Sequence, residues 1–264
     1  MNNNRRIKAA CEKELSRIVK MEDALCKRAM TKSPKWIERL NENIPAKVVT
    51  GLQGAFCKAF ALVFDKGTSV IDKTYDSGEL SRHFMLQDYA VRLKRSRKEL
   101  KRMRKVASKS NVMNSLISTA EGAALGALGI GLPDVIVFIG ILLKGAYEIA
   151  TQYGYDHTLP AERMLILKMM EVALIKSDDW ARLNAKIDVL SVSDSTPTED
   201  EIKAQTKRTA DAFAINMLGI KFIQGIPVAG IIGGIANPVY YNRVTKYVQL
   251  KYYKRYVRNL HAEL

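Results

Sequence analysis

The sequence predicts an all-α protein folded as a multi-helix bundle, and three observations support this prediction. Apolar residues recur at three- and four-residue steps from Ile7 to Leu25, as they do along one face of a helix. No segment shows the alternation of apolar and polar residues that marks a strand. With 264 residues, 47% of them hydrophobic, the chain is long enough to bury a substantial core.

Residues 1–110 are expected to form an N-terminal helical region. Residues 5–30 carry the amphipathic pattern just described, and a second, short helix begins at Pro34, because proline fits the first turn of a helix. Residues 45–64 are mostly apolar and predict a third helix. Residues 79–106 predict one long basic helix.

Residues 111–264 are expected to form a glycine-rich helical core, continuous with the first region in a single domain. Nine of the sixteen glycines lie in two windows, residues 122–131 and 219–234. Glycine costs about 1 kcal/mol in a helix interior, so close packing or a hydrocarbon environment must offset it. We therefore expect two glycine-rich, closely packed helical hairpins, which either stay in the bundle core or open toward a bilayer.

The other helices of this region are marked by their ends. Gly154 is suited to a left-handed helix cap, and Thr198 with Glu201 forms a capping box. The helices are expected at residues 134–153, 160–176, 178–190, from 199 to the second glycine window, and from Pro238 to about 260.

The charge indicates an anionic partner. The chain has 42 Lys+Arg against 27 Asp+Glu, a net charge of +15, which suits either a phospholipid surface or nucleic acid. No nucleic-acid docking motif is present, so a membrane surface is favoured. The alternative for a charged helix is simple solvation. The basic residues expected to contact the membrane or another anion are Arg92, Lys94, Arg95, Arg97, Lys98, Lys101, Arg102, Arg104, Lys105, Arg243, Lys246, Lys254, Arg255 and Arg258.

The last helix also carries six of the eleven tyrosines, interleaved with its basic residues. Tyrosine favours a water–bilayer interface, where the ring is in an apolar layer and the hydroxyl stays hydrated. Packing of the same tyrosines against the rest of the bundle is the alternative.

No residue pattern identifies a reaction. The three cysteines and three histidines lack metal-ligand spacing, and no phosphate-binding loop or nucleophile motif is present, so no metal or cofactor is implied. The remaining catalytic candidates are Glu121, Asp134 and Asp156, which could line an apolar cavity in a lipid- or peptide-processing hydrolase. Asp134 beside Pro133 also fits a helix cap.

Two ordered motifs within residues 115–260 resemble the EcsC protein family. The first consists of Glu121-Gly122, Gly126, Gly129, Pro133-Asp134 and Tyr153-Gly154-Tyr155-Asp156. The second consists of Ile226-Pro227-Val228-Ala229-Gly230, Gly233, Asn237 and Tyr253-Lys254-Arg255-Tyr256. The resemblance implies a bacterial protein that is cytoplasmic or membrane-associated, from a family named after an operon that also encodes an ABC transporter. It supplies no established catalytic residues. The motif residues expected to form a ligand site or the core are Gly122, Gly126, Gly129, Pro133, Tyr153, Pro227, Gly230, Gly233 and Asn237.

Together, charge and resemblance predict a non-enzymatic helical protein at the cytoplasmic face of a membrane. It would bind anionic lipid or a membrane-protein partner such as a transporter. The basic N-terminus is not followed by an apolar segment, so we expect the chain to stay in the cytosol, peripheral to the inner face of the membrane.

Overall fold

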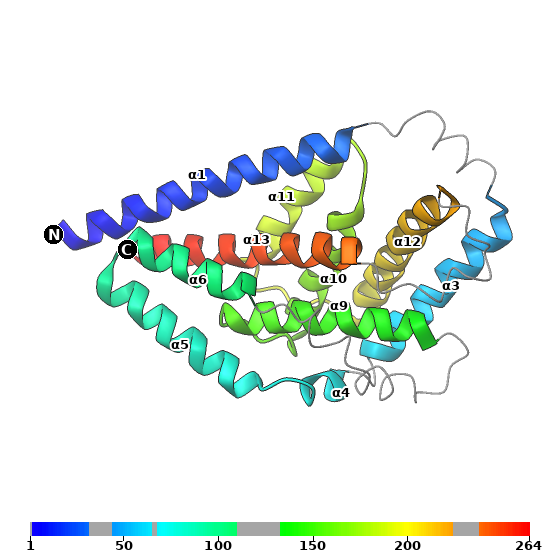
Figure 1. Cartoon of the computed structure of the whole chain (residues 1–264), viewed down its shortest axis with the longest axis horizontal. Helices are drawn as coiled ribbons and strands as arrows, with labels where there is room; N and C mark the ends of the chain where they lie inside the picture. The colour runs from blue at the N-terminus through cyan, green and yellow to red at the C-terminus, as the bar shows by residue number, and fades with distance from the viewer. Residues whose placement is uncertain (1, 32–43, 65–67, 110–132, 224–237) are drawn as a thin grey trace.

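The computed structural model describes residues 2–31, 44–64, 68–109, 133–223 and 238–264. Within these ranges the chain forms ten α-helices and no strand, which confirms the predicted all-α fold. The two glycine windows lie almost wholly outside them, so the glycine-rich hairpins stay a prediction. The helices are α1 (Asn2–Met30), α3 (Ala46–Leu62), α4 (Thr68–Asp72), α5 (Ser77–Lys94), α6 (Arg97–Lys109), α9 (Pro133–Gln152), α10 (Pro160–Leu174), α11 (Trp180–Leu190), α12 (Glu199–Ile223) and α13 (Pro238–Ala262) (Figure 1).

The C-terminal helix α13 runs through the middle of the bundle (Figure 1). It packs against α1 and α6 from the N-terminal part of the chain and against α9, α10 and α11. Helices α3 and α12 form a pair that packs on α9 and α10, while α5 packs along α9. The first and last helices of the chain are therefore neighbours in one core.

Four phenylalanines join the α3–α12 pair to α9. The ring centroid of Phe213 on α12 lies 5.8 Å from that of Phe56 and 5.6 Å from that of Phe60, both on α3. It lies 6.1 Å from the ring of Phe138 on α9, in an edge-to-face arrangement. All four rings are buried. Such rings bury large apolar areas, and their favourable mutual orientations add to the stability of this end of the bundle.

The tyrosines of α13 are buried, so they pack against the bundle and do not form an interfacial belt. The hydroxyls of Tyr252, Tyr253 and Tyr256 donate to carboxylates of other helices, and those of Tyr240 and Tyr247 donate to neutral oxygens. Tyr253 donates to Glu14 of α1 at 3.1 Å, and Tyr252 donates to Glu162 of α10 at 2.9 Å. Each tyrosine is 5% exposed or less: Tyr240, Tyr241, Tyr247, Tyr252, Tyr253 and Tyr256.

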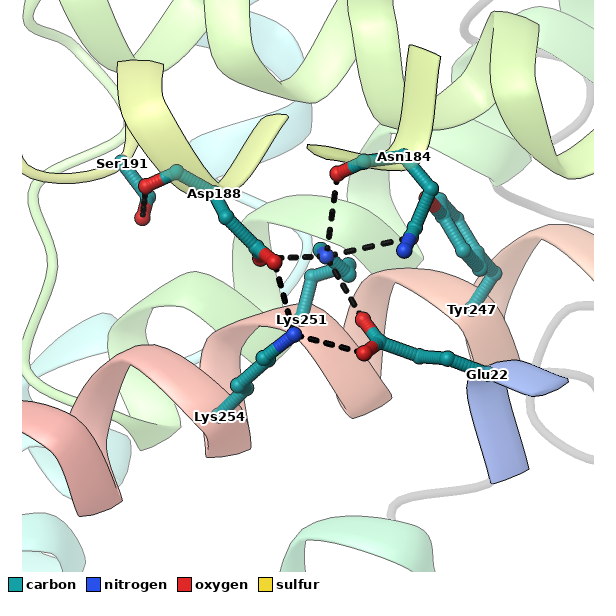
Figure 2. Close-up of polar contacts among 7 residues, drawn as sticks. All are labelled: Glu22, Asn184, Asp188, Ser191, Tyr247, Lys251 and Lys254. Atoms are coloured by element: carbon teal, nitrogen blue, oxygen red, sulfur yellow. Dashed lines mark hydrogen bonds and ion pairs between the residues drawn. The ribbon is translucent and has the colours of Figure 1, made fainter. Parts of the chain in front are cut away.

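A buried ion cluster joins α13 to α1 and α11 (Figure 2). Lys251 Nζ lies 2.7 Å from Glu22 Oε1 and also pairs with Asp188. Lys254 Nζ lies 2.5 Å from Glu22 Oε2 and 2.6 Å from Asp188 Oδ2. Asn184 accepts hydrogen bonds from Lys251 at 3.1 Å and from the hydroxyl of Tyr247 at 2.7 Å. Two lysines therefore share two carboxylates, and the cluster is electrically balanced.

A second buried carboxylate, Glu14, joins α1 to α6 and α13. Its side chain is fully buried, and it accepts from Arg97 Nε at 2.7 Å and from Arg104 Nη1 at 2.8 Å. Burial alone would raise the pKa of Glu14, but the hydrogen bonds from Arg104, Arg97 and Tyr253 outweigh it and lower that pKa. Glu14 is therefore held ionised between two arginines.

The prediction of one continuous basic helix over residues 79–106 is wrong, because the chain turns at Arg95. Helix α5 ends at Lys94, Arg95 takes a left-handed conformation with φ of 45°, and α6 begins at Arg97. The Arg95 amide donates to the carbonyl of Val91 at 2.9 Å and closes the end of α5. The two helices pack on each other, and α6 faces Glu14.

Gly154 makes the turn that follows α9. Its φ is 79°, which confirms the predicted left-handed residue at this helix end. A Cβ at this position would lie 2.4 Å from the Phe84 ring of α5, so the turn also requires the absence of a side chain. The close approach of α5 to α9 thus depends on glycine here.

Replacing Gly154 with alanine is expected to lower the free energy of unfolding by about 2 kcal/mol, since strain at positive φ adds to the clash with Phe84. Gly51→Ala on α3 is the matched control, because a Cβ there meets no atom within 4 Å. It should raise stability by up to about 1 kcal/mol. Urea unfolding of both variants measures the difference, and a neutral Gly154→Ala would contradict this account.

Asp188→Asn is expected to lower the free energy of unfolding at pH 7 by about 3 kcal/mol, because two lysines would then share one carboxylate. Burial acts to raise the pKa of Asp188, but Lys251 and Lys254 outweigh it and lower that pKa. Its contribution is therefore complete above the unfolded-state pKa of about 3.9 and is lost as the pH falls through the lower folded-state value.

The measurement is urea unfolding from pH 7 downward. The loss of stability below about pH 4 should be shallower in Asp188→Asn than in the wild type. Asp194→Asn, in the exposed loop after α11, is the control and should change stability by less than about 0.5 kcal/mol. Equal effects of the two substitutions would show that the ion cluster is not a stabilising unit.

Candidate functional site

An apolar stripe runs along the outer face of α5. Met85, Leu86, Tyr89 and Leu93 are each between 62% and 69% exposed. Their spacing places them on one side of the helix. The opposite side of α5 faces the core through Val91, which is fully buried. Helix α5 is thus apolar on two sides, and only one of them has a partner among the described residues.

A groove of about 360 Å³ joins this stripe to α6. Leu86 and Ala90 line it from α5, and Arg102, Met103 and Val106 line it from α6. Val106 is itself 36% exposed. The apolar stripe and the outer side of α6 therefore form one continuous surface. We call Met85, Leu86, Tyr89, Leu93, Lys98, Lys101, Arg102 and Val106 the α5–α6 surface.

Because α6 is amphipathic, some of its basic residues face the core of the bundle and others face outward. Leu100, Met103 and Ala107 are buried and fix the inner side of the helix. Arg97 and Arg104 point inward to Glu14, as described above. Three basic residues on the outer side of α6 are exposed: Lys98, Lys101 and Arg102. None of them makes an ion pair or hydrogen bond with any described residue.

Four further basic residues predicted for the membrane lie near this surface. Arg92 is held by Asp88 and Glu263, each at 2.7 Å, and Lys94 lies 3.4 Å from Glu99. Arg95 donates to the side chain of Asn4, and Lys105 is exposed. Their contact with an anion stays a prediction, but Arg92, Lys94 and Arg95 already have partners in the protein.

The basic residues of the last helix are mostly turned into the bundle. Lys254 belongs to the ion cluster of Figure 2. Arg255 pairs with Glu162 and lies over the ring of Tyr155, 4.0 Å from its centroid. Arg243 donates to the carbonyl of Leu174 at 3.3 Å. Lys246 is exposed and Arg258 is partly exposed. Helix α13 therefore offers two scattered basic residues to an external anion, and not a basic face.

The motif segment that follows α9 borders a cavity of about 440 Å³. Tyr153 is buried, while Tyr155 and Asp156 line the cavity. Asp156 Oδ1 accepts from the side chain of Thr158 at 2.7 Å and from its backbone amide at 2.9 Å, and these two bonds lower the pKa of Asp156. The carboxylate of Asp156 thus stabilises a local turn.

The same cavity contains a histidine–aspartate pair that was not among the predicted site residues. His157 Nε2 lies 2.9 Å from Asp72 Oδ1, and the buried imidazole stacks on the ring of Tyr147 with centroids 4.3 Å apart. No sequence spacing points to this pair, because its members are 85 positions apart. Among the described residues, no group of three or more His, Cys, Asp or Glu side chains is placed to hold a metal ion.

The remaining predicted residues cannot be placed in a site. Glu121, Gly122, Gly126, Gly129, Pro227, Gly230, Gly233 and Asn237 lie outside the described residues. Pro133 and Asp134 begin α9, but their side chains are not described. Convergence of Glu121, Asp134 and Asp156 on one apolar cavity therefore stays a prediction.

One helix in the described part of the chain is long and apolar enough to cross a membrane. It is α9, over Val135–Gln152, and 83% of this stretch is buried in the bundle. Core helices pass the same test of length and composition, so the stretch is weak evidence for a span.

The comparisons with known proteins agree with the resemblance found in the two motifs. Two similar proteins come from Bacillus subtilis (strain 168). The uncharacterized protein YdbA is 28% identical over 148 residues, which are 52% of this chain and 52% of YdbA. Protein EcsC is 24% identical over 202 residues, 75% of each chain. This chain thus spans about half the length of the first relative and three quarters of the second. No solved structure matches it.

The family model of the EcsC proteins matches residues 10–257. The match extends beyond the two motifs and includes most of α1 and all of α5 and α6. The α5–α6 surface therefore lies within the region that the family model covers. Since this region is most of the sequence, the chain belongs to the EcsC protein family.

Proposed function

We propose that this protein associates peripherally with membranes by binding anionic lipid through the α5–α6 surface. The observation that carries the proposal is the exposed apolar stripe of α5 directly beside the unpaired basic residues of α6. An apolar stripe alone would suit many partners. Its basic neighbours favour a partner that is apolar inside and negatively charged at its surface, as a phospholipid leaflet is.

The apolar stripe and the basic residues both contribute to binding, and the apolar stripe contributes more. Transfer of one leucine side chain from water to an apolar phase is worth about 2 kcal/mol, and the stripe has two leucines, a methionine and a tyrosine. Each basic residue near an anionic leaflet contributes about 1 kcal/mol. Lys98, Lys101 and Arg102 pair with no carboxylate of the described residues, so they are available for this contribution.

The net charge of +15 supports the same partner, because long-range attraction brings such a protein to an anionic surface before any specific contact forms. The proposed site is the cytoplasmic leaflet of a bacterial membrane, where anionic headgroups are exposed. A membrane protein such as a transporter is the competing partner. The spread of the charges along a helix face favours many mobile headgroups over one fixed partner.

The triple variant Lys98→Gln, Lys101→Gln, Arg102→Gln tests the electrostatic part. We expect it to bind phosphatidylglycerol vesicles about 100-fold more weakly than the wild type in a co-sedimentation assay at low salt, since three contributions of about 1 kcal/mol are lost. The control variant Lys20→Gln, Lys203→Gln, Lys207→Gln removes the same charge from α1 and α12 and should retain most of the binding. Equal losses would mean that net charge alone brings the protein to vesicles.

The double variant Leu86→Ser, Leu93→Ser tests the apolar part. Both side chains are more than 60% exposed, so the fold should be unaffected. The wild type is expected to keep part of its vesicle binding at high salt, and this part should be lost in the variant, because salt screens charges but not apolar insertion. No wild-type binding to anionic vesicles at low salt would rule out a lipid partner and favour a membrane protein.

A further inference from the structure

A second candidate site lies away from the α5–α6 surface, in a cavity of about 700 Å³ between α10, α11 and α12. The loop that precedes α12 closes one side of it through Ser195, Thr196 and Pro197. The cavity shares no residue with the α5–α6 surface. Ligand binding in this cavity can therefore be tested independently of membrane binding.

Three helices each contribute one cation to this cavity. Lys168 comes from α10, Lys186 from α11 and Arg208 from α12. Burial makes the largest contribution to lowering the pKa of Lys168; the charges of Arg208 and Lys186 lower it further, and those of Glu171 and Glu201 act in the opposite direction. Burial disfavours the charged ammonium group, and the nearby cations add to this effect.

The acidic side chains nearby are already engaged. Glu201 Oε2 accepts from the backbone amide of Thr198 at 2.8 Å and completes the capping box of α12. Glu171 Oε2 accepts from Gln205 Nε2 at 2.5 Å. Lys186 is exposed and makes no ion pair or hydrogen bond with any described residue. The lining holds three cations and one carboxylate, Glu201, so the cavity has more positive than negative charge.

A fully buried glutamine holds two of the cations in place. Gln205 Oε1 accepts from Lys168 Nζ at 3.0 Å and from Arg208 Nη2 at 2.9 Å. Its amide nitrogen is fixed by Glu171 and by the hydroxyl of Thr209, which in turn donates to the carbonyl of Leu167 at 3.1 Å. Two like charges are thus brought to one neutral oxygen. Lysine and arginine each keep further N–H donors for a ligand.

Besides the three cations, Glu201, Ser195 and Thr196, the lining of the cavity is apolar. Its apolar lining consists of Ala161, Met164, Val189, Leu190, Pro197 and Ala204. Small-molecule sites commonly combine an apolar lining with a few convergent polar groups that fix the orientation of the ligand. A ligand that suits both parts has an anionic head and a short apolar body.

We propose that this cavity binds a phosphomonoester, with the phosphate between Lys168, Lys186 and Arg208 and the organic part against the apolar lining. A phosphate offers several acceptor oxygens, so it can receive donors that approach from three helices, and arginine matches its geometry well. The same head group occurs on soluble organic phosphates and on the lipid phosphatidic acid.

The test is isothermal titration calorimetry, in which the full chain is titrated separately with hexyl phosphate, inorganic phosphate and hexanol. Hexyl phosphate should bind, inorganic phosphate should bind at least about tenfold more weakly, and hexanol should not bind measurably below about 10 mM. No binding of hexyl phosphate below that concentration would overturn the proposal.

Two exposed positions provide variants that leave the core intact. Arg208→Gln should weaken hexyl phosphate binding about tenfold or more, and Lys186→Gln about fivefold. Lys203→Gln is the matched control, because Lys203 is exposed and its ion pairs within the described residues are those with Glu199 and Asp200 at the start of α12. It should bind as the wild type does. Equal affinities for all three variants would overturn the proposed site.

Vesicles separate the two sources of the head group. If the physiological ligand is lipid, Arg208→Gln should weaken binding to phosphatidic acid vesicles more than Lys203→Gln does, with no such difference on phosphatidylglycerol. If it is soluble, the two variants should bind both vesicles equally while only Arg208→Gln loses affinity for hexyl phosphate. Failure of vesicle binding by the wild type would affect the membrane proposal alone.

Discussion

The structure depends on one constraint: the polar side chains of a helix placed in the centre of a bundle must all find partners. Helix α13 carries lysines, an arginine and tyrosine hydroxyls into the core, and a buried charge without a partner is strongly destabilising. Carboxylates of four other helices meet them: Glu14 and Glu22 from α1, Asp88 from α5, Glu162 from α10 and Asp188 from α11. These pairs fix the positions of those helices around α13, because each partner must lie within hydrogen-bonding distance.

The same constraint decides which basic residues are left for function. Carboxylates inside the bundle pair with Arg97, Arg104, Lys254 and Arg255, so the total of 42 basic residues overstates the number that a partner can contact. Exposed cations without an ion pair or hydrogen bond to any described residue remain on several helices, and three of them, Lys98, Lys101 and Arg102, lie together on the outer side of α6. Their position next to an exposed apolar stripe distinguishes them from ordinary solvated lysines, which lie among polar neighbours.

The sequence predicts the helices and their ends well, because periodicity, the Thr198–Glu201 capping box and Gly154 are local signals. It does not predict the burial of α13. A helix rich in tyrosine and lysine suits a bilayer interface and a carboxylate-lined core equally, and the partners Glu14 and Tyr253 are 239 positions apart. The turn at Arg95 was also not predicted, since a left-handed arginine has no sequence signal of the kind that glycine provides. The cavity site depends on Gln205, whose role is visible only once three helices are assembled.

The central position of α13 also makes the α5–α6 surface rigid. Tyr256 donates to Asp88 at 2.8 Å, and Arg92 bridges Asp88 to Glu263, so α5 is held at two points beside the end of α13. Helix α6 is held through Glu14 by the same core. A surface that is already ordered loses little conformational freedom when it binds, so most of its interaction energy is available for affinity. Exposed apolar side chains on such a support lower solubility, and this cost is one reason for proposing a binding role for them.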